Sequence, residues 1–211
     1  MIGFYDYTVI LTYISFASSI SGIFCAITGH FRWAIFCLAF SGLCDMFDGK
    51  IARTKKDRTR EEKSFGIQID SLCDVVCFGA FPIVLCYSLG MKHIYSMIIL
   101  IFYGLAGVIR LGFFNVLAEE DDAAKKDVKP CYHGLPITSM AVALPLAYLL
   151  SPLLHGFFII VLHIMVLVIA ILFVTDFKFR KPTNKELSLI VGIVAIAVLG
   201  VLFRWDRRVG L

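Results

Sequence analysis

The stretch CDMFDGKIARTKKDRTREEKSFGIQIDSLCDVVCFG, residues 44–79, places four aspartates next to long apolar segments. They are Asp45, Asp48, Asp70 and Asp74. A carboxylate beside hydrocarbon costs several kcal/mol unless another group pairs with it. The fold and the function of this chain therefore depend on what these four carboxylates pair with.

The sequence around this stretch predicts an all-α, polytopic membrane protein. Of its 211 residues, 59% are hydrophobic and 17% are charged, whereas soluble domains are roughly 25% charged. Because about 20 apolar residues span a bilayer as a helix, we expect about seven helical segments in one domain, residues 1–211. They are predicted at 7–28, 32–53, 65–89, 93–117, 135–150, 154–174 and 187–204.

Lys and Arg are concentrated in alternate loops of this pattern. Six lie between the second and third segments: Arg53, Lys55, Lys56, Arg58, Arg60 and Lys63. The other set of loops holds only Arg32 and Lys92, so the positive-inside rule places the basic loops and the N-terminus in the cytoplasm. Arg204 and its basic neighbours would then lie outside, which suggests that the last segment is re-entrant or that the helix count is wrong by one.

The spacing of the aspartates brings them together. Asp45 and Asp48 are three residues apart and Asp70 and Asp74 are four apart, so each pair lies on one face of a helix. If the basic stretch between them is a turn, the helices are antiparallel and the four carboxylates meet just inside the cytoplasmic surface. Such a cluster suits divalent cations and phosphoryl transfer. The plainer interpretation is pairing with nearby Lys and Arg at a solvated helix end.

The residues Asp45-x2-Asp48-Gly49-x2-Ala52-Arg53 and Gly66-x3-Asp70-x3-Asp74 resemble the signature of the CDP-alcohol phosphotransferase family. The resemblance implies a six-helix membrane core, usually a homodimer, that displaces CMP from a CDP-linked donor by attack of an alcohol. It implies that the four aspartates bind two divalent ions, Mg²⁺ or Mn²⁺, and that Asp74 is also the catalytic base. The residues implied for the cytidine-diphosphate site are Asp48, Gly49, Ala52, Arg53 and Gly66.

Three further stretches resemble the phosphatidylserine synthase branch of that family: residues 69–79, 109–116 and 133–139. This implies CDP-diacylglycerol and L-serine as substrates, in a cell membrane with the site on the cytoplasmic side, and no nucleic-acid partner. Arg110 and Asn115 are candidates for holding serine or the lipid phosphate. Alternatively, Arg110 extends its charge to the cytoplasmic surface and Asn115 marks a helix end.

Two other functions stay open at this stage. A sister synthase would use glycerol phosphate or an inositol phosphate, dianionic acceptors that need an added basic cluster near the aspartates. An ion-coupled transporter would use the aspartates as its relay, but it would need polar residues at mid-membrane on several helices.

Overall fold

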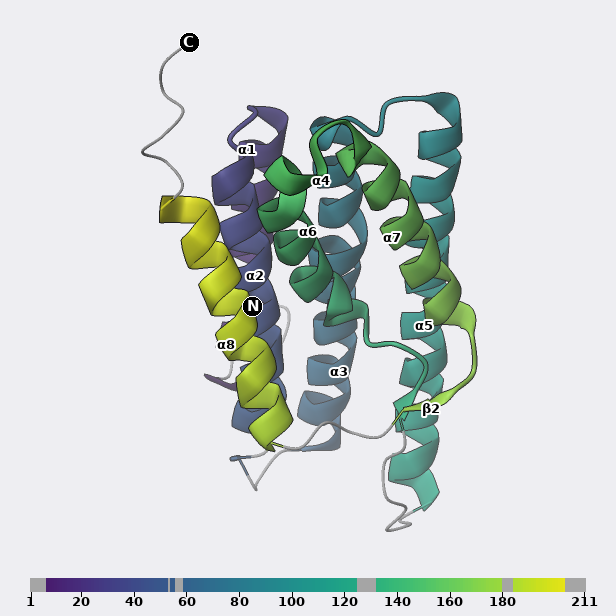
Figure 1. Ribbon diagram of the computed structural model, residues 1–211. Helices are drawn as coiled ribbons and strands as arrows, with labels where there is room; N and C mark the ends of the chain where they lie inside the picture. Colours follow the sequence, from purple (N-terminus) through teal and green to yellow (C-terminus); the bar gives the residue numbers. More distant parts are fainter. Residues whose placement is uncertain (1–6, 53, 56–58, 125–131, 180–183, 204–211) are drawn as a thin grey trace.

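The computed structural model describes residues 7–52, 54–55, 59–124, 132–179 and 184–203, and nearly all of them are helical (Figure 1). The α-helices are α1 (Tyr7–Ile27), α2 (Phe31–Ala52), α3 (Arg60–Asp74), α4 (Phe81–Leu89), α5 (Ile94–Ala124), α6 (Met140–Leu154), α7 (Phe158–Val174) and α8 (Asn184–Phe203). A π-helix, η1 (Val75–Ala80), joins α3 to α4, and the 3₁₀ turns η2 (Ile137–Ser139) and η3 (His155–Phe157) flank α6.

The predicted helical bundle with seven segments is confirmed, because α3, η1 and α4 form one continuous span. In the part of the chain that the structure describes, four helices are long and apolar enough to cross a membrane: Val9–Ile27, Glu61–Leu89, Ile94–Leu117 and Ile137–Leu154. Phe158–Val174 and Val191–Leu202 are shorter apolar helices. The chain is an integral membrane protein. Helix α8 is continuous from Asn184 to Phe203, so its described residues contain no re-entrant turn.

The third segment begins at Arg60, five residues earlier than predicted, because a capping box closes its first turn. The Thr59 hydroxyl accepts a hydrogen bond from the Glu62 N–H, and the Glu62 carboxylate accepts one from the Thr59 N–H. Two of the N–H groups that a helix start leaves unpaired are satisfied in this way. The capped turn carries the helix beyond the apolar run and into the charged stretch.

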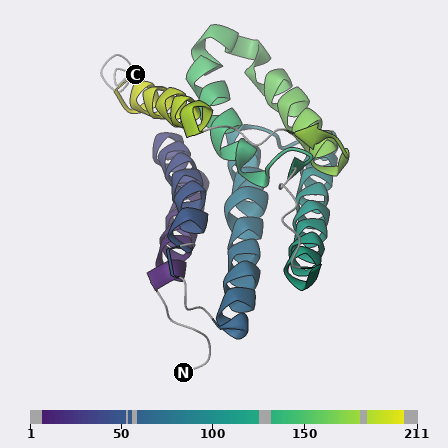
Figure 2. The same cartoon turned by 90° about the horizontal axis from the view of Figure 1, so that it is seen from below.

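The helices form two groups around the third span. Helix α1 packs along α2 on one side, α5 packs along α7 on the other, and α6 contacts α2, α7 and α8. The view in Figure 2 places α3 between the α1–α2 pair and α5. Helices α2 and α6 approach closely at Gly42, where an added Cβ would lie 2.5 Å from the Ala141 Cβ. The fully buried side chains at the centre include Phe78, Phe81 and Leu144.

Two short strands lie at the end of the bundle where α2 ends and α3 begins (Figure 1). Strand β1 (Tyr132–His133) pairs antiparallel with β2 (Lys178–Phe179). Gly134 follows β1 with φ +72°, and its N–H donates to the Phe177 carbonyl oxygen at 2.9 Å. The segment that leads into α6 is therefore fixed to the end of α7.

Candidate functional site

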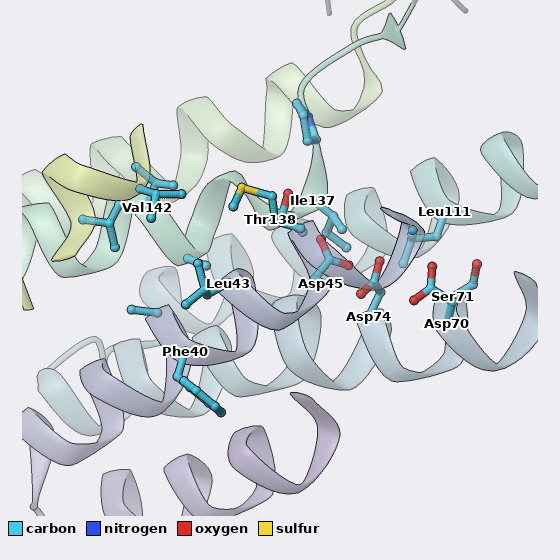
Figure 3. Close-up of a pocket in the computed structure, with 18 of the residues that line it drawn as sticks. Phe40, Leu43, Asp45, Asp70, Ser71, Asp74, Leu111, Ile137, Thr138 and Val142 are labelled. Carbon is cyan, nitrogen blue, oxygen red and sulfur yellow. The ribbon is translucent and has the colours of Figure 1, made fainter. Parts of the chain in front are cut away.

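Helices α2 and α3 bring the predicted aspartates together, as the spacing indicated. Asp45, Asp70 and Asp74 each offer a carboxylate oxygen, and these oxygens all lie within 4.8 Å of one another. Figure 3 shows the three side chains converging from the two helices. Asp45 lies seven residues before the end of α2, which puts it about 10 Å along the helix from that end.

Asp48 belongs to the same cluster but faces away from its open side. Its carboxyl group lies beside that of Asp70, while the Asp45 carboxyl lies beside that of Asp74. Only 8% of Asp48 is exposed, and its Oδ2 accepts a hydrogen bond from the Thr12 hydroxyl of α1 at 3.4 Å. Asp48 is thus held between two helices, whereas the other three aspartates face a cavity.

The plainer interpretation of the aspartates is not supported in the part of the chain that the structure describes. There the four carboxyl groups interact with one another, with the Thr12 hydroxyl and with the backbone at Gly49, and none forms an ion pair with Lys or Arg. Asp70 Oδ1 is buried and has no hydrogen-bond partner among those residues. A buried carboxylate oxygen left in this state is costly, and a cation would satisfy it.

This arrangement fits a divalent metal. Carboxylate oxygens are the ligands that Mg²⁺ and Mn²⁺ prefer, and the three oxygens lie close enough together for the group to be able to hold a metal ion. The donor set contains no thiol or imidazole, which softer metals would select. The cluster is therefore a candidate metal centre formed by Asp45, Asp70 and Asp74, with Asp48 next to it.

A cavity of about 810 Å³ opens beside the three aspartates. One end is polar and includes Ser71, Arg110, Asn115 and Thr138. The other end is apolar and lies between α2, α6 and α8; Figure 3 shows Phe40, Leu43 and Val142 there. Helix α8 supplies five residues of this apolar wall: Val191, Val194, Ala195, Val198 and Leu199. The cavity can therefore hold a molecule with a charged head and a hydrocarbon body.

The two predicted substrate residues both lie on the polar wall of this cavity. Arg110 of α5 is only 7% exposed, and its guanidinium carbon lies 4.5 Å from the centre of the Phe114 ring. Asn115 accepts a hydrogen bond through Oδ1 from the Ser71 hydroxyl at 2.8 Å, which links α5 to α3 beside Asp70. Arg110 is therefore buried on the lining of the cavity that also holds Asp45, Asp70 and Asp74.

Only some of the residues predicted to bind the nucleotide lie on the described lining of the cavity. Gly49 lines the cavity, and Gly66 lies on α3 one turn before Asp70 but not on the cavity wall. Ala52 is the last residue of α2, and its side chain is not described. Arg53 lies outside the described residues.

Sequence reasoning missed the contribution of α1. Thr12, Ser15 and Ser19 are buried and lie on one face of the helix, at spacings of three and four residues. Ser15 and Ser19 hydrogen-bond to the Ser41 hydroxyl at 2.7 and 2.9 Å, and Thr12 bonds to Asp48. The spacing of these three hydroxyls along one face of α1 was the signal available in the sequence.

Comparison with known proteins agrees with the motifs. A family model described as CDP-alcohol phosphatidyltransferase matches residues 8–176. The CDP-diacylglycerol–serine O-phosphatidyltransferase of Saccharomyces cerevisiae is 31% identical over 149 residues, covering 68% of this chain and 52% of that protein. The protein of the same name from Methanocaldococcus jannaschii is 27% identical over 190 residues, covering 90% of this chain and 83% of its own length.

A related name occurs in a third relative. Archaetidylserine synthase of Methanothermobacter thermautotrophicus is 32% identical over 141 residues, covering 66% of this chain and 56% of that protein. The chain spans about half the length of the yeast and Methanothermobacter proteins and most of the Methanocaldococcus one. Helix α8 lies beyond the residues that the family model matches.

Proposed function

Because the chain belongs to the CDP-alcohol phosphatidyltransferase family, we propose that it transfers the phosphatidyl group of CDP-diacylglycerol to the hydroxyl of L-serine and releases CMP. One observation carries this proposal. Three carboxylates within 4.8 Å of one another stand at the polar end of a cavity whose other end is apolar. A lipid with a diphosphate head matches both ends. Three of the relatives compared above carry names for enzymes that act on serine or make a seryl lipid.

In this proposal the four aspartates hold two divalent ions, Mg²⁺ or Mn²⁺. When bound, the ions would offset charge on the diphosphate and on the departing CMP. Asp45, Asp70 and Asp74 would contact the ions directly from the cavity. Asp48, held by the Thr12 hydroxyl, would complete the set from behind.

Asp74 is proposed as the base. A serine hydroxyl is a poor nucleophile at neutral pH, so removing its proton during attack accelerates the reaction. The hydroxyl oxygen bonds to the phosphorus next to diacylglycerol, the bond from that phosphorus to the CMP oxygen breaks, and Asp74 takes the proton. Asp74 suits this role because it lines the cavity one turn beyond Asp70.

The donor lipid is proposed to lie along the whole cavity. The cytidine diphosphate would occupy the end near Gly49, which lines the cavity. Asp48, Ala52, Arg53 and Gly66 are proposed to complete its site from outside the described cavity wall. The hydrocarbon chains would follow the apolar wall formed by α2, α6 and α8. Burial of apolar chains against this wall contributes roughly 25 cal/mol for each Å² removed from water.

The small positive charge on the described lining of the cavity favours serine over more highly charged acceptors. Arg110 is the one basic side chain on the described lining of the cavity. One guanidinium suits the carboxylate of serine, or one lipid phosphate, and a dianionic sugar phosphate would need further positive charge. Phe114 fixes the guanidinium from one face, and Asn115 offers an amide nitrogen nearby.

The proposal also covers location and assembly. The basic loops are proposed to face the cytoplasm, with the site in the plasma membrane at that side. Residues 1–211 act as one domain, and two copies form a homodimer.

The test is an acceptor panel with purified protein and CDP-diacylglycerol in mixed micelles, with CMP release as the readout. We expect turnover with L-serine, little with glycerol phosphate or inositol phosphate, and none in excess EDTA. Preference for a phosphorylated acceptor would reject serine as the substrate. Full turnover in EDTA would reject the metal centre.

A further inference from the structure

The Tyr103 hydroxyl of α5 donates a hydrogen bond to the backbone carbonyl oxygen of Phe78 in η1. Tyr103 is 1% exposed and Phe78 is fully buried, so water does not reach this contact. The Tyr103 ring also packs at 5.6 Å, between ring centres, from Phe173 of α7. A buried side-chain bond to a helix carbonyl needs a reason, because helix carbonyls are normally satisfied within the helix.

The reason lies four residues further along the chain. In an α-helix the Phe78 carbonyl would accept from the N–H of residue 82, but that residue is Pro82, which has no N–H. The proline ring also crowds the carbonyl four residues before it. The π-helix relieves this crowding, and within it the Phe81 N–H donates to the Val76 carbonyl. The Phe78 carbonyl therefore lacks its α-helical donor, and the Tyr103 hydroxyl donates to it.

This contact is directly connected to the aspartate cluster. Asp74 is the last residue before η1, so the π-helix sets how Asp70 and Asp74 are rotated relative to the packed face of α4. One additional residue in a turn rotates the helix by roughly 100°. On α5, Tyr103 lies seven residues before Arg110, two turns away on the same face. The bond therefore fixes α5, with Arg110, against the span that carries Asp74.

We propose that Tyr103 is a positioning residue for the metal centre: its hydroxyl holds the π-helix after Asp74 and thereby keeps Asp70 and Asp74 aligned with Asp45. This inference rests on the proposed function to the extent that the carboxylates bind divalent cations. It does not depend on which alcohol is the acceptor.

The first test is Tyr103→Phe, which removes one oxygen and leaves the buried ring in place. We expect Mn²⁺ binding to the purified, detergent-solubilised protein, measured by electron paramagnetic resonance without substrate, to weaken about tenfold. Tyr87→Phe is the matched control. Tyr87 lies on α4 of the same span and is 42% exposed, so this variant should bind Mn²⁺ as the wild type does.

The second test restores a donor from the other side. Pro82→Ala supplies an N–H that can reach the Phe78 carbonyl, so in this background Tyr103→Phe should weaken Mn²⁺ binding by less than about threefold. If Tyr103→Phe alone does not fold, the same reasoning requires that Pro82→Ala restores folding. A role for Tyr103 in packing alone predicts equal effects in both backgrounds, and that result would overturn the proposal.

The outcomes also separate this inference from the proposed function. Normal Mn²⁺ affinity in Tyr103→Phe overturns the positioning role alone. Weakened Mn²⁺ binding in a protein that does not use serine supports the positioning role and rejects the acceptor assignment. A wild-type protein that binds no Mn²⁺ overturns both.

Discussion

Asp74 occupies the junction between α3 and η1 and faces both the other carboxylates and the cavity. Asp74→Asn keeps the size and one oxygen of the side chain but removes the carboxylate that we propose as the base. We expect turnover to fall by about 10²–10⁴, the usual contribution of general base catalysis, while CDP-diacylglycerol still binds. The measurements are kcat from CMP release and donor affinity from direct binding.

Asp45→Asn and Asp48→Asn are the comparison variants, since they should weaken metal and nucleotide binding together. Retention of more than about a tenth of wild-type turnover by Asp74→Asn would show that Asp74 is not the base.

Thr12 supports the cluster from α1 through its bond to Asp48. Thr12→Val keeps the shape of the side chain and removes the donor, leaving a buried carboxylate oxygen without that partner. Loss of a hydrogen bond worth about 1 kcal/mol should raise the metal concentration for half-maximal activity about fivefold. Thr12→Ser should restore the wild-type value. If Ser and Val behave alike, the hydroxyl does not act on Asp48.

Among single residues, the sequence predicted the clustering of the aspartates but not the buried hydroxyl groups that hold them in place. The carboxylate spacings are local properties of two helices, so they could be read directly. The partners Thr12 and Tyr103 lie 36 and 25 residues away from the groups they contact, and only packing brings them there. Single hydroxyls in apolar helices give a weak signal until the neighbouring helix is known.

Among the helices too, features set by local sequence were predicted and features that depend on distant contacts were not. Helices α1 and α2 were predicted nearly to the residue because their apolar runs end where the helices end. The early start of α3 could have been predicted from Thr59-x2-Glu62, which is a capping-box pattern. The π-helix could not, because Pro82 is compatible with a kink, a break or a π-helix, and the Tyr103 contact accompanies the last of these.

Gly134 tests the fixed segment before α6. Its φ of +72° disfavours other residues, and an added Cβ would lie 3.2 Å from the Thr175 carbonyl oxygen. Gly134→Ala should therefore lower the free energy of unfolding by about 1–2 kcal/mol, measured as a lower Tm in detergent. Gly192→Ala on α8 is the control, because nothing lies within 4 Å of its added Cβ. Equal Tm values for the two variants would contradict this account.

For the whole molecule, hydropathy predicted the bundle but not the cavity. The seven segments follow from apolar runs of sufficient length. The cavity wall combines α2, α5, α6 and α8, which are distant in sequence, and no local pattern states that α8 closes it. The alternating basic loops predict only how the bundle is oriented across the membrane, which a separate experiment can test.

Orientation can be tested with single cysteines in a background lacking the native ones. Glu61→Cys lies at the exposed start of α3, and Lys92→Cys lies between α4 and α5. With basic loops in the cytoplasm, an impermeant thiol reagent should label Lys92→Cys in intact cells and Glu61→Cys only after permeabilisation. The opposite pattern would invert the proposed topology.

The apolar end of the cavity, between α2, α6 and α8, has a kinetic consequence. If the donor enters there, it arrives by lateral diffusion and never crosses bulk water. Its effective concentration is then its mole fraction among the surrounding amphiphiles. Inert detergent added at a constant amount of donor would therefore lower turnover, because it dilutes the donor within the micelles. Dilution with buffer that leaves the micelle composition and the serine concentration unchanged would not lower it. Serine arrives from solution, so the turnover rate would depend on its molar concentration in the buffer. The rate would therefore follow a surface concentration for the lipid donor and a bulk concentration for serine.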